Sequence, residues 1–198
     1  MKALTHDDLM PLAEYEKIRD SFRSRIITLK RRRRISVGNK VTLVFENWDT
    51  IQFQILEMIR VERIFDPAKI QEELDVYNAL LPREGELSAT LLIEITESER
   101  IPQELDAFQG IDQGETVALQ AGPHVAYGLF ETGHSKEGKI SAVHFVRFRP
   151  RREFREALAT VGTPAFVEIT HRLYRARVPV PPETREEWLA DLGQPSPR

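Results

Sequence analysis

The sequence predicts an α+β fold, in which an antiparallel meander sheet of about five strands is flanked by N-terminal, central and C-terminal helices. Three observations predict it. Apolar residues recur every three or four positions near both ends of the chain and between residues 50 and 81, which is the period of a helix. In the middle of the chain they alternate with polar residues, which is the period of a strand. The connections 122–123 and 132–138 are shorter than a parallel crossover, which requires about twelve residues or more.

Six helices are expected, over residues 13–31, 50–65, 67–81, 102–108, 151–161 and 183–192. The first carries an apolar stripe that begins at Tyr15, and its other face is basic. Asp49 stands three residues before Gln52, in a capping-box pattern that predicts the start of the second helix. A strand over 51–55 is the alternative for that segment. Asp66, followed by proline, predicts the start of the third helix.

Five strands are expected, over residues 41–46, 87–95, 116–121, 124–131 and 139–149. No composition change marks a domain boundary before the last residues of the chain. Residues 1–192 are therefore expected to form a single domain. Residues 193–198 are expected to be a flexible tail, because this segment contains two prolines and no residue that would anchor it.

The composition of the 198-residue chain excludes several kinds of chemistry. It contains no cysteine, so its own side chains can supply no thiolate nucleophile and can hold no iron–sulfur cluster or cysteine-ligated metal. The sequence does not identify any other cofactor. No run of about 18 apolar residues is present, so we expect no segment that spans a membrane. The N-terminus becomes acidic where a signal peptide would be apolar, which predicts a cytoplasmic protein.

Charge is segregated along the chain, although the net charge is only −3. Residues 17–34 hold nine Lys and Arg against one Asp, and residues 46–106 hold fifteen acidic against five basic residues. One interpretation is that these segments face each other in the fold. The other is that a basic run stays exposed and binds phosphate or an acidic partner protein. That run consists of Lys30, Arg31, Arg32, Arg33 and Arg34.

We do not expect nucleic-acid binding. The isoelectric point is about 6.0, and no aromatic side chain interrupts the basic run to provide a surface on which bases could stack.

Charged side chains interrupt the second helix, which is otherwise apolar on nearly all sides and should be deeply buried. Glu57, Arg60 and Arg63 then need partners, because an unpaired buried charge costs several kcal/mol. Glu57 and Arg60 are three residues apart and can reach each other. One interpretation is a structural ion network. The other is that these three residues form the polar floor of a ligand or partner site.

His124 and His144 are expected to be cross-strand neighbours. A hairpin connection centred near Ser135 places His144 opposite Ala126 and diagonal to His124, at about 7–8 Å between Cα atoms. At that distance the two imidazoles can share a divalent metal ion. The alternative is two ordinary packed histidines, and a register error of one residue separates the pair. No local signature of a hydrolase, an NTPase, a dinucleotide-binding protein or a zincin is present.

Four stretches of the chain, residues 4–10, 46–78, 141–148 and 174–178, resemble a bacterial family that is known as domain of unknown function 3501. The resemblance covers nearly the whole chain and brings no established reaction. It implies an association with rubrerythrin-like proteins or iron–sulfur oxidoreductase subunits, in which this cysteine-free chain holds no cluster itself.

These observations lead to one leading hypothesis and two rivals. We expect a non-enzymatic binding or accessory protein of a cytoplasmic redox or iron-handling system, which docks through its basic helix and the region of Glu57 and Arg60. One rival is a small metalloenzyme or metal-binding protein that uses His124 and His144. The other is a homodimer in which the apolar second helix forms part of the interface.

Overall fold

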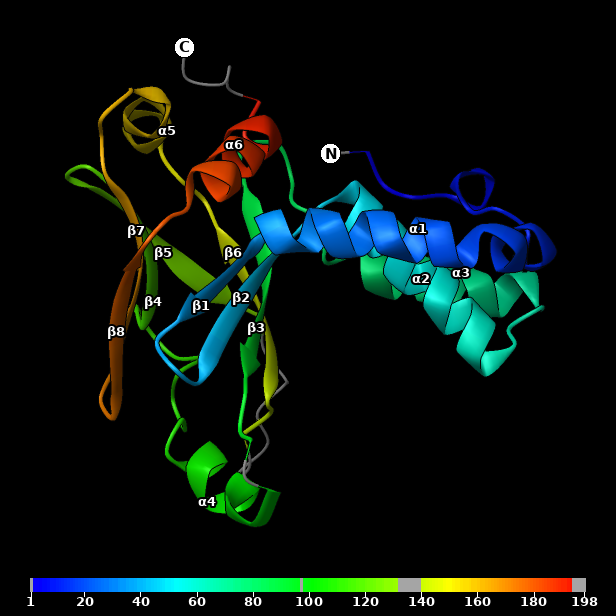
Figure 1. Ribbon diagram of the computed structural model, residues 1–198, viewed down its shortest axis with the longest axis horizontal. Helices are drawn as coiled ribbons and strands as arrows, with labels where there is room; N and C mark the ends of the chain where they lie inside the picture. Colours follow the sequence, from blue (N-terminus) through cyan, green and yellow to red (C-terminus); the bar gives the residue numbers. More distant parts are fainter. Residues whose placement is uncertain (1, 97, 132–139, 194–198) are drawn as a thin grey trace.

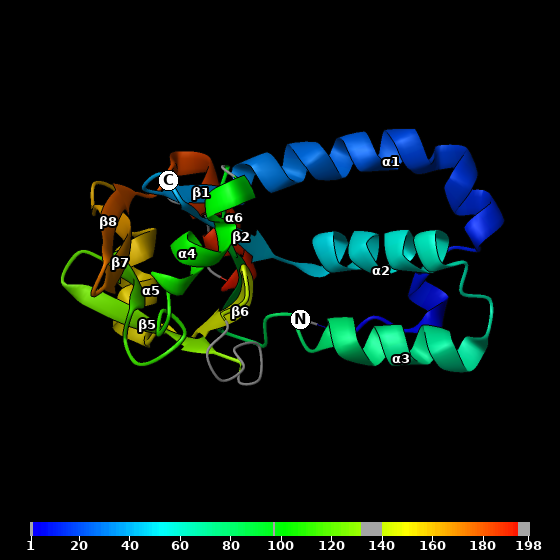
Figure 2. The same ribbon diagram turned by 90° about the horizontal axis from the view of Figure 1, so that it is seen from below.

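The computed structural model describes residues 2–96, 98–131 and 140–193. It confirms the mixture of helices and antiparallel strands and has two parts (Figures 1 and 2). One part is a strongly curled sheet with helices at its ends. The other is an arm of three helices that extends away from the sheet. Residues 194–198 of the expected tail lie outside the described residues.

Within the described residues, eight strands form the sheet, rather than about five. Their spatial order is β1-β2-β3-β6-β5-β4-β7-β8, and each neighbouring pair is antiparallel. The order is a meander only in part, because β3 pairs with β6 and not with β4. The strands are β1 (Arg34–Val37), β2 (Val41–Glu46), β3 (Leu87–Ile93), β4 (Val117–Ala121), β5 (His124–Phe130), β6 (Val143–Phe148), β7 (Ala165–His171) and β8 (Tyr174–Pro179).

The expected set of strands lacks β1, β7 and β8. β1 begins at Arg34, the last residue of the basic run, and only three residues of the strand follow it. This alternating segment is too short to predict a strand from the sequence. In β7, buried residues alternate with more exposed ones, as they do in a strand with one face on a core. The hairpin of β7 and β8 thus extends a sheet that the sequence predicts to be smaller.

The sheet is nearly closed and barrel-like, because its two edge strands meet at Tyr174. The Tyr174 hydroxyl donates a hydrogen bond to the Val37 carbonyl oxygen at 2.6 Å and accepts one from the Lys40 backbone N–H at 3.1 Å. Gly38 permits this approach. Its φ is +76°, and a Cβ atom at this position would collide with the Tyr174 hydroxyl. One side chain therefore fastens β8 to the turn between β1 and β2.

The main hydrophobic core fills the interior of the sheet. Helices α5 (Arg152–Ala159) and α6 (Pro182–Asp191) cover one end, and Phe154 of α5 and Trp188 of α6 are buried in this core. The Trp188 ring lies 4.7 Å from that of Phe45, measured between ring centroids. At the other end lie the short turn η2 (Ser98–Arg100) and α4 (Ile101–Asp106) (Figure 1).

The arm consists of α1 (Leu12–Arg32), α2 (Trp48–Glu62) and α3 (Pro67–Asn78), preceded by the turn η1 (His6–Asp8). Figure 2 shows α2 between α1 and α3. Ile51, Ile55 and Ile59 of α2 belong to one apolar cluster with α3, and Leu56 belongs to another with Tyr15 of α1. Because α2 and α3 are inserted between the neighbouring strands β2 and β3, the arm and the sheet have separate cores.

The expected second helix is present as α2, and the alternative of a strand over 51–55 is wrong. Its N-cap is Asn47, not Asp49. The Asn47 side chain accepts a hydrogen bond from the Thr50 N–H at 3.0 Å, and the Thr50 hydroxyl accepts one from the Asn47 N–H at 2.9 Å. The last turn of α2 is exposed, with Val61 64% accessible, so the deep burial that we expect for the helix holds only for its first part.

Candidate functional site

Glu57 is the centre of an ion network between α1 and α2. Its carboxylate accepts a hydrogen bond from the Tyr15 hydroxyl at 2.7 Å and two from the Arg19 guanidinium group, each at 2.8 Å. Arg60 donates two more, at 3.2 and 3.3 Å. The expected ion pair between Glu57 and Arg60 is therefore present, and it belongs to a larger structural network, as one interpretation of the sequence predicts.

This network satisfies Glu57 from within the arm. The hydrogen bonds from Arg19 outweigh burial and lower the pKa of the Glu57 carboxyl from its ordinary value of 4.5 to about 2. Burial and the hydrogen bond to Glu57 raise the pKa of the Tyr15 phenol above its usual range. Arg63 lies apart from the network, exposed at the end of α2, and forms no ion pair with a described residue. The polar floor that the sequence analysis considers for Glu57, Arg60 and Arg63 is thus not one site.

Arg33 contradicts the expectation that the whole basic run is exposed. Its side chain is completely buried where α1 meets β2 and α6. The guanidinium group donates a hydrogen bond to the Phe45 carbonyl oxygen at 2.8 Å and pairs with Glu187 at 2.7 Å and with Asp191. Arg33 therefore fastens α6 to the arm and the sheet, and a partner protein cannot reach it.

Two neighbours of Arg33 also have acidic partners within the chain. Arg32 pairs with Glu187 of α6 at 3.0 Å, and Arg34 pairs with Glu94. The pair of Arg34 and Glu94 fits the other interpretation, in which the basic segment 17–34 faces the acidic segment 46–106, whereas Glu187 lies outside that acidic segment. Arg31 differs, because it is exposed and forms no ion pair with a described residue.

A basic stripe remains on α1, in a form that the sequence analysis did not single out. Arg23, Ile27, Lys30 and Arg31 are spaced by three or four residues and lie along one side of the helix. Ile27 is 39% exposed, and the three basic side chains form no ion pair with any described residue. We call these four residues the α1 stripe. Their helical spacing is visible in the sequence once the run 30–34 is not treated as a unit.

The register of β5 and β6 contradicts the shared metal site of His124 and His144. Gly128 pairs with Phe148 and Phe130 pairs with Val146, which shifts the register by six positions from the expected one. His124 lies at the start of β5, and His144 lies at the opposite end of this strand pair, where it faces β3. Within the described part of the chain, no three His, Asp or Glu side chains are grouped so that they could hold a metal ion.

The two histidines have different surroundings. His144 is buried, with Nε2 2.8 Å from the Ser141 carbonyl oxygen and Nδ1 3.9 Å from the Asp112 carboxylate. These contacts fit the alternative of a packed histidine. His124 is half-buried and lies at the edge of a hollow on the sheet.

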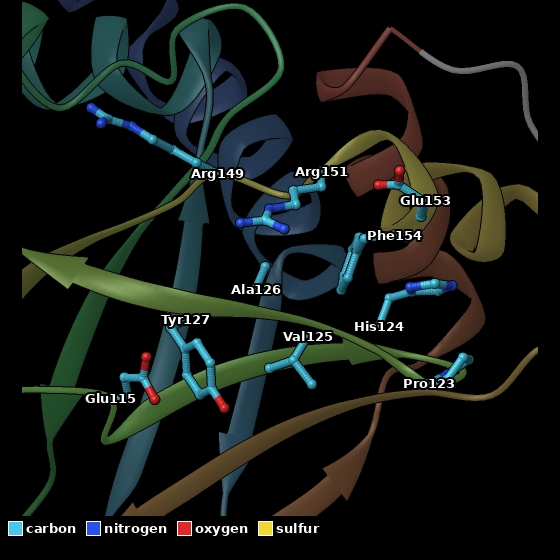
Figure 3. Close-up of a pocket in the computed structure, with 10 residues that line it drawn as sticks. All are labelled: Glu115, Pro123, His124, Val125, Ala126, Tyr127, Arg149, Arg151, Glu153 and Phe154. Carbon is cyan, nitrogen blue, oxygen red and sulfur yellow. The ribbon is translucent and has the colours of Figure 1, made fainter.

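This hollow has a volume of about 630 Å³ and lies between β5 and the start of α5 (Figure 3). Ala126 and Phe154 are buried beneath it. Figure 3 shows the Arg151 side chain extending over Ala126, whereas Arg149 points away toward the arm. Arg149 pairs with Glu86 at 2.7 Å. Arg151 is therefore the arginine in the lining of the hollow whose charge is not already paired with a described residue.

The hollow carries charges of both signs. Glu115 and Glu153 line it together with Arg151, and none of these three side chains forms an ion pair with a described residue. His124 and Tyr127 add two further polar groups. The hollow therefore presents two carboxylates and one guanidinium group that is unpaired among the described residues, so a preference for anions does not follow from its lining.

No helix within the described residues combines the length and the apolar character that crossing a bilayer requires.

Comparisons with known proteins agree with the resemblance found in the sequence. A solved structure of a protein of unknown function from Burkholderia pseudomallei K96243 is 33% identical to this chain. The match covers 96% of this chain and 100% of that one, with a TM-score of 0.88. No curated protein matches the chain. The profile of the family described as "Protein of unknown function (DUF3501)" matches residues 3–192. The chain therefore belongs to the DUF3501 family.

Proposed function

We propose that this protein is a non-enzymatic accessory protein that docks an acidic surface of a partner protein through the α1 stripe. The observation that supports the proposal is the division of the basic residues of α1. Arg33 is used by the fold itself, whereas Arg23 and Arg31 are exposed and Lys30 is half-buried beside them, all three without an acidic partner among the described residues. Such uncompensated charge attracts an acidic surface and accelerates association with it.

The composition of the α1 stripe favours a protein as the partner. Ile27 lies between Arg23 and Arg31, one helical turn from each, and offers an apolar contact in the middle of the basic groups. An apolar centre with a charged rim is the usual arrangement of a protein interface. Surfaces that bind single-stranded nucleic acid combine basic side chains with aromatic side chains on which bases stack, and the stripe has no aromatic side chain.

The setting that we propose is a cytoplasmic redox or iron-handling system, with a rubrerythrin-like protein or an iron–sulfur oxidoreductase subunit as the partner. This part of the proposal rests on the family resemblance and on the absence of cysteine, which leaves any cluster with the partner.

Affinity capture from native lysate at low salt, with mass-spectrometric identification, tests the proposal. The wild-type chain is compared with the double variant Arg23→Glu, Arg31→Glu, and Arg172→Glu is the matched control. Arg172 is an exposed arginine of the β7–β8 turn that forms no ion pair with a described residue. We expect a redox or iron protein to be recovered by the wild type and the control and lost from the double variant. Recovery of no such protein, or equal recovery by all three chains, contradicts the proposal.

A further inference from the structure

The outer face of α3 carries acidic groups around an exposed apolar residue. α3 lies on the side of the arm opposite α1 (Figure 2), and it packs on α2 through the buried Leu74. Glu72, Asp75 and Val76 lie on the side away from Leu74, and Val76 is 63% exposed. We call these three residues the α3 face. Lys69 is the basic residue on the same side of the helix.

Negative charge around α3 exceeds positive charge. Residues 62–75 hold five acidic side chains against two basic ones. Burial, and then the charges of Glu62 and Glu72, raise the pKa of the Glu73 carboxyl. Asp75 accepts a hydrogen bond from the neutral side chain of Gln71 at 2.8 Å, and Glu72 has no ion pair with a described residue. The α3 face is therefore an acidic surface that the arm does not neutralise.

The opposite excess is found on α1. Residues 21–32 hold five basic side chains and no acidic one. Two of the five have partners within the chain, because Arg25 lies 3.7 Å from Asp49 and Arg32 pairs with α6. The other three are the basic members of the α1 stripe.

We propose that the α1 stripe of one copy of this protein docks on the α3 face of a second copy, with Ile27 against Val76 and the basic side chains opposite Glu72 and Asp75. Each surface has an exposed apolar residue with a charged group one helical turn away, Arg23 and Arg31 for Ile27 and Glu72 for Val76, and the charges are opposite in sign. The inference goes beyond the proposed function, because it requires no other protein, although it uses the same α1 stripe.

The contact joins two different surfaces and is therefore heterologous. Because α1 and α3 lie on opposite sides of the arm, each copy can dock one neighbour through its α1 stripe and another through its α3 face. Copies then add head to tail, into a ring where the rotation between them closes and into an open chain where it does not. Either assembly depends on the same pairs of residues.

Sedimentation velocity of the full chain, at about 50 mM and about 500 mM salt, tests this contact. The stripe variant carries Arg23→Glu and Arg31→Glu, the face variant carries Glu72→Lys and Asp75→Lys, and Arg172→Glu is the control. All five substituted positions are exposed, and an unchanged urea midpoint confirms that each variant is folded. The decisive sample is the equimolar mixture of the stripe variant and the face variant.

We expect the wild type and the control to associate at low salt, about tenfold more weakly at high salt. Each reversed variant alone should be monomeric, because like charges then face each other. Their mixture should associate again, because an intact stripe meets an intact face. A wild type that is monomeric at every concentration at low salt overturns the inference. So does a reversed variant that associates as the wild type does, or a mixture that stays monomeric.

The face variant separates this inference from the proposed function. It leaves the α1 stripe intact, so a heterologous acidic partner should still be captured from lysate by a chain that no longer associates with itself. Loss of self-association with retained capture supports both statements. Self-association that follows the expected pattern without capture of a redox or iron protein contradicts the proposed function alone.

Discussion

The phenol of Tyr15 on α1 and the carboxylate of Glu57 on α2 are joined by a hydrogen bond of 2.7 Å. Tyr15 is completely buried, and the side chain of Glu57 is 21% exposed. The same carboxylate holds Arg19 of α1 and Arg60 of its own helix, so one charged group positions the two helices relative to each other. The position of the α1 stripe on the arm thus depends on a charge whose hydrogen bonds are made with side chains of the arm itself.

Replacing Glu57 by glutamine should lower the free energy of unfolding by about 2 kcal/mol. Glutamine keeps the shape of the side chain but loses the charge that Arg19 and Arg60 surround, and the half-buried guanidinium groups are then left without compensation. Equilibrium urea unfolding measures the change. Glu16→Gln, at an exposed position on α1, is the control and should change stability by less than about 0.5 kcal/mol. Equal effects of the two substitutions would show that the network contributes nothing to the fold.

The stability contributed by Glu57 should depend on pH. Its folded pKa of about 2 lies below the ordinary value of 4.5, so the folded state binds the proton more weakly than the unfolded chain does. The contribution is therefore complete above pH 4.5 and is lost as the pH falls from 4.5 toward 2. Unfolding free energies measured across this range should decrease more steeply for the wild type than for Glu57→Gln. Parallel curves for the two chains would contradict the lowered pKa.

The helices are predictable from the sequence because their signals are local. Asp66 before Pro67 predicts the start of α3, and the Asp66 side chain does accept a hydrogen bond from the Ala68 N–H at 2.9 Å. The start of α2 is harder to locate, because Asn47 with Thr50 and Asp49 with Gln52 are overlapping capping patterns in adjacent positions. A hydrogen bond favours the pattern of Asn47 with Thr50, because the Thr50 hydroxyl also donates to the Glu46 carboxylate at 2.6 Å.

The sheet and the burial of charges are less predictable because they depend on distant parts of the chain. The alternation of residues does not reveal the register of β5 and β6. The expected register placed His124 beside His144, whereas the actual register separates them. Arg33 and the exposed Arg31 both have basic residues on either side in the sequence, so local sequence does not distinguish them. It is buried because α6, more than 150 residues later in the sequence, brings two acidic side chains to it.

Arg33→Met should destabilise the protein by about 4 kcal/mol, because it leaves Glu187 and Asp191 partly buried without their cation. Arg31→Met, two positions earlier and exposed, is the matched control and should change stability by less than about 0.5 kcal/mol. Urea unfolding at neutral pH makes the comparison. Similar losses for the two variants would contradict the structural role of Arg33.

The destabilisation of Arg33→Met should also increase with pH. Burial raises the pKa of Asp191 from 3.8 to about 6 in the wild type, although Arg33 opposes this effect. Without Arg33 the folded pKa rises further. A carboxyl whose folded pKa is raised favours the folded state when protonated and disfavours it when ionised, so stability is lost as the pH rises through the folded pKa. The variant should therefore lose more stability at pH 8 than at pH 5. If the variant lost the same unfolding free energy at pH 5 and at pH 8, the pKa of Asp191 would not depend on Arg33.

Gly38→Ala should break the contact that Tyr174 makes between β8 and the β1–β2 turn. Gly162→Ala is its matched control. Both glycines have positive φ, +76° and +80°, so both substitutions carry the backbone cost of about 1 kcal/mol. Only at Gly38 does the new Cβ atom meet the Tyr174 hydroxyl, which must then release Val37 and Lys40. We expect Gly38→Ala to lose about 2 kcal/mol more than the control and to accelerate hydrogen exchange at the Lys40 amide. If the two variants lose the same stability and the Lys40 amide stays protected, Tyr174 does not close the sheet.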